Sequence, residues 1–191
     1  MITTRTTRTL GLLGVLGGAC LLAVAVLQMI GSLGPTTDEV LSTVGFLGLA
    51  AALIGLLRMG AAPSRPGRAG LWIWIVGVLS ISAAGIVGAM FSLSEDSNLL
   101  LPVGGIGQLI GGLVAGIAIG RAGVLEGWLR WAPLAWAVTF AVSIPFGFTD
   151  SRLSAVLFAV FGLAAIATSA GVATASTPVR DTERTPTAAV S

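Results

Sequence analysis

Histidine, lysine and tyrosine are absent from this chain, and cysteine occurs once, as Cys20. Without histidine there is no Ser-His-Asp triad and no histidine metal ligand. Without lysine there is no Schiff base and no Ser-Lys dyad, and one cysteine cannot form an intrachain disulfide. We therefore expect no cofactor and no metal site, and we expect that the protein is not an enzyme.

Charge is also scarce. Charged residues make up 9% of the 191 residues, hydrophobic residues make up 55%, and the mean hydropathy is +0.99. A soluble domain carries about 25% charged residues, so lipid is expected to be the solvent for most of this surface. All ten basic residues are arginines spread over short segments. Because a nucleic-acid surface needs clustered charge on a soluble face, no nucleic-acid partner is expected.

The charged residues divide the chain into six long uncharged windows, and each window can hold one membrane-spanning helix of about 20 residues. The continuous apolar runs favour helices, because backbone groups in lipid must be satisfied within their own segment. The fold class expected is an all-α integral membrane protein, a bundle of six transmembrane helices. The predicted spans cover residues 10–31, 40–60, 71–93, 99–120, 129–148 and 153–175.

The positions of the arginines predict the orientation of the bundle. With six spans, nine of the ten arginines lie on one side of the membrane, and only Arg152 lies on the other. An arginine excess marks cytoplasmic segments, so both termini are expected inside, with the helices arranged as three antiparallel hairpins. The lack of lysine, with abundant alanine, glycine, valine and arginine, is typical of a GC-rich bacterial genome, so the expected location is a bacterial cytoplasmic membrane.

The two ends of the chain differ from the spans. Residues 1–9 are predicted to be a short cytoplasmic segment, and the following helix is expected to stay uncleaved, because its apolar run is longer than a signal peptide requires. Residues 176–191 are small, polar and charged, with two prolines, so a disordered cytoplasmic tail is expected there.

An internal repeat is one interpretation of two short coincidences. Val44-Gly45-x-x-Gly48 recurs as Val103-Gly104-x-x-Gly107, and Trp72 and Trp131 share the same offset of 59 positions. Three tandem hairpins would explain this spacing, whereas chance in a glycine-rich chain is the alternative. Four tryptophans at helix starts are expected at the membrane interface, namely Trp72, Trp74, Trp128 and Trp131.

One predicted helix carries a stripe of residues with almost no side-chain volume, spaced four apart. Its members are Gly104, Gln108, Gly112, Gly116 and Gly120. Residues at this spacing share a helix face, and glycine faces allow membrane helices to approach closely. The stripe is therefore predicted to be a packing surface on which Gln108 forms a hydrogen bond across the interface. Glycine scattered by codon bias is the alternative.

Uncharged polar residues near the middle of the spans have two interpretations. They are Ser80, Ser82, Gln108, Thr139 and Ser143. They could line a polar pathway for a neutral solute, or they could form hydrogen bonds between helices, which is the more common case. No ionisable residue lies inside the uncharged windows, and Arg58 and Arg121 lie at helix ends where their side chains can reach the interface, so an ion-coupled transporter is not expected.

Two classes of function follow. In the first, the protein is a non-enzymatic membrane component that acts through helix–helix packing, as an accessory subunit, a scaffold or a self-assembling bundle. In the second, it is a small carrier or channel for an uncharged or lipid-like solute. The expected partners are the lipid bilayer and either a second copy of the chain or another membrane protein.

Overall fold

The computed structural model describes residues 2–91, 98–144 and 152–175, and every regular element in these ranges is a helix. The elements are α1 (Ile2–Met29), α2 (Pro35–Arg58), α3 (Arg65–Phe91), α4 (Leu100–Ala122), the 3-10 helix η2 (Gly127–Trp131), α5 (Ala132–Ser143) and α6 (Arg152–Thr174). Five of them, all except η2 and α5, are long and apolar enough to cross a membrane. They indicate a membrane-embedded helical protein.

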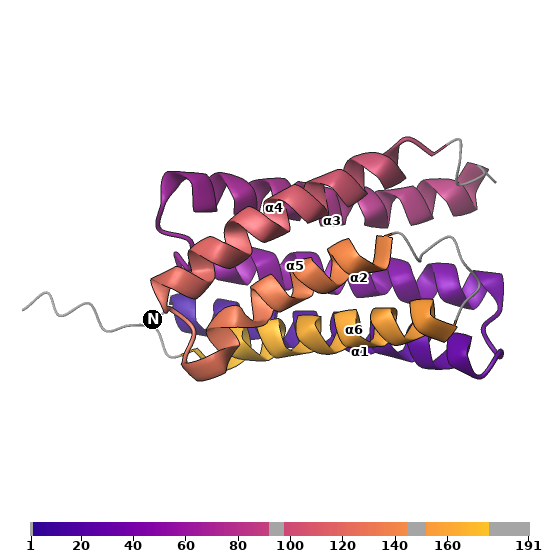
Figure 1. Cartoon of the computed structure of the whole chain (residues 1–191), viewed down its shortest axis with the longest axis horizontal. Helices are drawn as coiled ribbons and strands as arrows, with labels where there is room; N and C mark the ends of the chain where they lie inside the picture. Colours follow the sequence, from indigo (N-terminus) through magenta and orange to yellow (C-terminus); the bar gives the residue numbers. More distant parts are fainter. Residues whose placement is uncertain (1, 92–97, 145–151, 176–191) are drawn as a thin grey trace, which may run out of the picture.

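Successive helices run in alternating directions along the long axis of the molecule (Figure 1). Each helix packs against the next one in sequence, and α1 also packs along α6, so the six helices form a closed ring. The start of α1 and the end of α6 lie at the same end of the bundle (Figure 1). The most extensive contacts in this ring join three helix pairs, namely α1 with α2, α3 with α4, and α1 with α6.

Local sequence explains where several helices begin and end. Pro35 occupies the first turn of α2, where its missing N–H leaves no helical hydrogen bond unmade. At the start of α3, the hydroxyl of Ser64 accepts a hydrogen bond of 3.2 Å from the N–H of Gly67. After α4, Gly123 takes a left-handed conformation with φ of +65°, which glycine adopts without steric cost and which ends the helix.

The helix bounds differ from the predicted spans mainly at the starts of α1, α2 and α3. α1 begins at Ile2 instead of residue 10, and α3 begins at Arg65 instead of residue 71. Arg5 and Arg8 lie within α1, and Arg65 and Arg68 lie within α3, because an arginine near a helix end can reach water. The fifth span begins as the 3-10 helix η2. The predicted tail at 176–191 lies outside the described residues.

The centre of the bundle is an aromatic cluster. Trp74 on α3 and Trp136 on α5 are fully buried, with ring centroids 4.5 Å apart. Trp136 also meets Phe161 on α6 edge-on, at 5.9 Å. The prediction that Trp74 lies at the membrane interface is therefore wrong. Trp72, two residues earlier, is 53% exposed on the other side of the same helix.

Candidate functional site

The α3–α4 hairpin is held by direct contact between glycine backbones. A Cβ atom added to Gly77 on α3 would lie 2.6 Å from the backbone nitrogen of Gln108 and 2.9 Å from the carbonyl oxygen of Gly104. A Cβ on Gly107 would lie 3.0 Å from the Cα of Gly77. One turn further along, Gly111 meets the backbone of Trp74. No side chain fits between the two helices at these positions.

The predicted glycine stripe of α4 lies entirely inside the protein, since all five of its residues are buried. Its first part faces α3. Its second part faces the following elements instead, with Gly112 near Ala137, Gly116 near Leu134 and Gly120 against the Trp131 ring. Residues four apart drift around a helix, because four residues turn about 40° more than one full turn. One stripe therefore contacts two partners in succession.

The α1–α2 hairpin has an equivalent crossing that contains the two glycines of the suspected repeat. A Cβ on Gly17 of α1 would lie 2.5 Å from the carbonyl oxygen of Gly45 and 2.8 Å from the Cα of Gly48. In α3–α4, Gly77 meets Gly104 and Gly107 through corresponding backbone atoms. The first two hairpins therefore share one crossing geometry at a spacing of 59 to 60 residues.

The third hairpin departs from this pattern. Trp136 lies 59 residues after Gly77, so a bulky ring replaces the glycine in α5. Gly162 of α6 is used differently, because it meets Gly18 and Leu22 of α1. Sequence reasoning missed the packing role of the α1 glycines. The signal was present in the sequence, because Gly11, Gly14 and Gly17 are spaced three residues apart and Gly18 lies four residues after Gly14.

Gln108 is fully buried, but the expected hydrogen bond across the stripe is wrong. Neither its amide nitrogen nor its amide oxygen has a hydrogen-bond partner among the described residues. The indole N–H groups of Trp74 and Trp136 are also buried without a partner. An unsatisfied buried polar group costs about 1–3 kcal/mol. We therefore expect Gln108 to reduce the stability of the interface that the neighbouring glycines form.

The mid-span hydroxyls do not link the helices to one another. Ser82 donates to Val78 O at 3.2 Å, Thr139 to Ala135 O at 2.8 Å, and Ser143 to Phe140 O at 2.8 Å. Each acceptor belongs to the same helix as its donor, so the predicted interhelical bonds are wrong for these three residues. Ser80 is half-buried on α3. None of the five polar candidates lines either of the two concave regions described below.

Two concave regions lie at opposite ends of the described bundle. We call one end the arginine-rich end, because the alternating helices gather there seven arginines, Arg5, Arg8, Arg58, Arg65, Arg68, Arg121 and Arg130. At the other end, a cavity of about 660 Å³ lies among α1, α2, α3, α4 and α6. Its polar lining consists of Gln28, Asp38, Glu39, Ser42, Thr43 and Asn98.

The lining of this polar cavity is partly apolar. Phe46, Ile81 and Phe158 line it together with the polar residues. Asn98 is 6% exposed, and its amide donates to Ala84 O at 2.9 Å, which ties the start of α4 to α3. Neither this cavity nor the groove at the arginine-rich end is lined by Ser80, Gln108 or Thr139.

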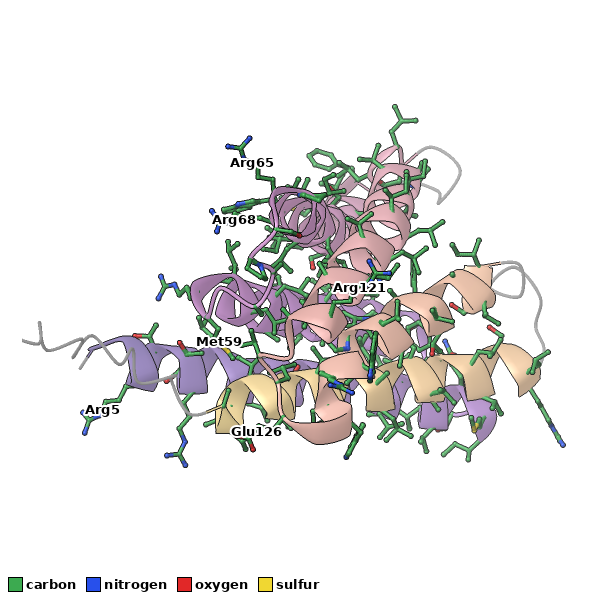
Figure 2. The ribbon with its side chains drawn as sticks, turned by 60° about the vertical axis from the view of Figure 1, so that its left-hand side comes forward. Arg5, Met59, Arg65, Arg68, Arg121 and Glu126 are labelled. Carbon is green, nitrogen blue, oxygen red and sulfur yellow. The ribbon has the colours of Figure 1, made fainter. Side chains whose placement is uncertain are left out.

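The groove at the arginine-rich end lies between the first turn of α3 and the last turns of α4. It has a volume of about 590 Å³, and its lining includes Pro66, Val114, Ile117 and Arg121. Figure 2 shows Arg121 on α4 at the same end of the molecule as Arg65 and Arg68 on α3. Arg121 is the one charged residue that lines it.

Comparison with protein-family models, with curated proteins and with solved structures finds no match to this chain.

Proposed function

We propose that the protein spans a bacterial cytoplasmic membrane six times, with the arginine-rich end in the cytoplasm. The one span beyond the five long helices, the fifth in chain order, would be η2 and α5 together with the residues that follow to 148. The arginine asymmetry supports this orientation, and the five long apolar helices support membrane insertion. A reporter fused after Ser191 should be active only in the cytoplasm, and one inserted near Asp38 only outside. Activity of both on one side would contradict an odd number of crossings between them.

We further propose that the protein is not an enzyme and acts through helix–helix contacts, as an accessory subunit, a scaffold or a self-assembling bundle. The observation that carries this proposal is the backbone contact between glycines at two equivalent crossings, Gly17 with Gly45 and Gly48, and Gly77 with Gly104 and Gly107. Membrane helices associate through such close contacts because lipid provides no hydrophobic reason to associate. Because the helices pack this closely, we expect the bundle to act as a rigid binding partner and not as a pathway for a solute.

Crosslinking and co-purification test this role. The full chain, tagged and purified in mild detergent after crosslinking in the membrane, should run as a defined homo-oligomer or with a stoichiometric membrane-protein partner. A monomer with no stoichiometric partner, both before and after crosslinking, would contradict the proposal. Mixing two differently tagged copies in one cell separates the two supporting outcomes, because only self-assembly retains both tags.

The second candidate is a small carrier or channel for an uncharged or lipid-like solute. The polar cavity at the end opposite the arginines favours it, since such a cavity is open to a solute. The two candidates differ in the accessibility of Ser80. In a Cys20→Ser background, Ser80→Cys should react with a membrane-impermeant maleimide if a hydrated pathway reaches the middle of the bundle. If the bundle is tightly packed, Ser80→Cys should stay unlabelled. Thr43→Cys, in the polar cavity, is the control and should be labelled.

A further inference from the structure

Arg121 is an uncompensated charge beside an apolar groove. Its guanidinium forms no ion pair and no hydrogen bond with another described residue, and no Asp or Glu lines the groove. Arg65 and Arg68, on the first turn of α3, are also exposed, but their side chains extend from the side of α3 away from Arg121 (Figure 2). Arg121 therefore supplies the positive potential that attracts an anion to the groove.

The rest of the groove is apolar and extends away from the charge. Val114 and Ile117 lie on α4, 38% and 40% exposed, and Val114 is seven residues before Arg121. At 1.5 Å per residue this places Val114 about 10 Å deeper along the helix. The wall on α3 consists of Pro66 and Gly67. A ligand that fills the groove therefore needs an anionic head and an apolar body at least about 10 Å long.

The backbone at the start of α3 does not provide the anion site. The N–H of Gly67 donates to the Ser64 hydroxyl at 3.2 Å, and the N–H of Arg68 donates to Ser64 O at 2.9 Å. Pro66 has no N–H to offer. Recognition of an anion consequently falls to the guanidinium groups, which match phosphate oxygens in bidentate geometry.

We propose that this groove is a binding site for an anionic phospholipid. The phosphate binds Arg121, and one acyl chain lies along Val114 and Ile117 between α3 and α4. The inference rests on the proposed membrane insertion, and it is independent of the proposed role in assembly.

Lipid binding to the purified full chain tests the site. Native mass spectrometry and thermal shift are measured with dioleoyl phosphatidylglycerol and with dioleoyl phosphatidylcholine. Phosphatidylglycerol should bind with one preferred site, and Arg121→Gln should weaken it about fivefold to tenfold, as expected for loss of one arginine near a lipid headgroup. Arg58→Gln is the matched control, since Arg58 occupies the last turn of α2 as Arg121 does that of α4. It should leave the affinity within twofold.

A second variant tests the apolar part of the groove without removing charge. Ala122 lines the groove and is exposed, so Ala122→Phe should fill the groove and weaken phosphatidylglycerol binding while the fold persists.

Equal losses in Arg121→Gln and Arg58→Gln would overturn the site in favour of diffuse surface charge. Equal binding of phosphatidylcholine, or protection by glycerol phosphate as strong as by the lipid, would overturn it as well. Loss of self-association or of a protein partner would leave these lipid results unchanged.

Discussion

The Gly77 crossing of α3 and α4 provides the sharpest test of how this bundle is held together. The perturbation is Gly77→Ala, which adds one methyl group. That methyl would lie 2.6 Å from the backbone nitrogen of Gln108, about 0.8 Å closer than an ordinary contact allows. The atoms in the way belong to the backbone of α4 and cannot turn aside as a flexible side chain could. The two helices must therefore move apart.

The size of the effect follows from a comparison with Gly105→Ala. Gly105 lies on α4 next to Gly104, but nothing is found within 4 Å of a Cβ at this position. Both substitutions gain helix propensity, up to about 1 kcal/mol for alanine over glycine. Because this gain is common to both variants, the difference in their stability equals the cost of overpacking, about 1–3 kcal/mol. Gly105→Ala should be as stable as the wild type or more stable, and Gly77→Ala less stable.

The assay is thermal unfolding of the full chain in mild detergent, followed by intrinsic tryptophan fluorescence. Trp74 and Trp136 are fully buried and in contact, so their emission reports loss of tertiary packing. For a chain of this size, each kcal/mol shifts Tm by about 2–4 °C. The Tm of Gly77→Ala should therefore lie about 2–12 °C below that of Gly105→Ala. Equal Tm values for the two variants would refute the backbone-contact reasoning.

Three further predictions use the same assay or purified protein. Gln108→Leu should raise stability by about 1–3 kcal/mol, because it removes a buried amide that has no partner; a destabilised variant would show that Gln108 is satisfied in the membrane. Gly17→Ala should destabilise the α1–α2 crossing by about 1–3 kcal/mol relative to Gly105→Ala, and stability equal to that control would count against the equivalence of the two crossings. Intact mass measurement should find the first helix retained, apart from removal of Met1, whereas a lipid-modified chain starting at Cys20 would contradict this.

The sequence predicted the positions of the helices well, because their dominant determinant is the length of each uncharged window. It placed helix ends less well. Arg65, taken as a residue of a loop, is the first residue of α3, since the Ser64 hydroxyl and Pro66 begin that helix. Such capping depends on a few polar atoms near the interface and not on hydropathy.

The sequence predicted where along each helix a residue lies, but it did not predict which face of the helix that residue occupies. Trp72 and Trp74 are two residues apart and were expected at the same interface, yet their exposed fractions are 53% and 0%. Residues two apart on a helix point in different directions, so one meets the surface when the other meets the core. The same limit applies to Gln108. The spacing of Gln108 from the glycines predicted that it shares their helix face. Whether its amide finds a hydrogen-bond partner depends on the side chains that α3 and α5 place opposite it, and the spacing does not reveal these.

The contact between α1 and α6 has a consequence for the order of events during synthesis. Gly18 and Gly162 meet across this pair, although about 140 residues separate them, which a ribosome adds in roughly 7–30 s. Throughout that interval the small-residue side of α1 that α6 will cover has no native partner. The contact between α1 and α6 is therefore the last helix contact to form. In a truncated chain that lacks α6, this side of α1 stays free to associate with other membrane segments.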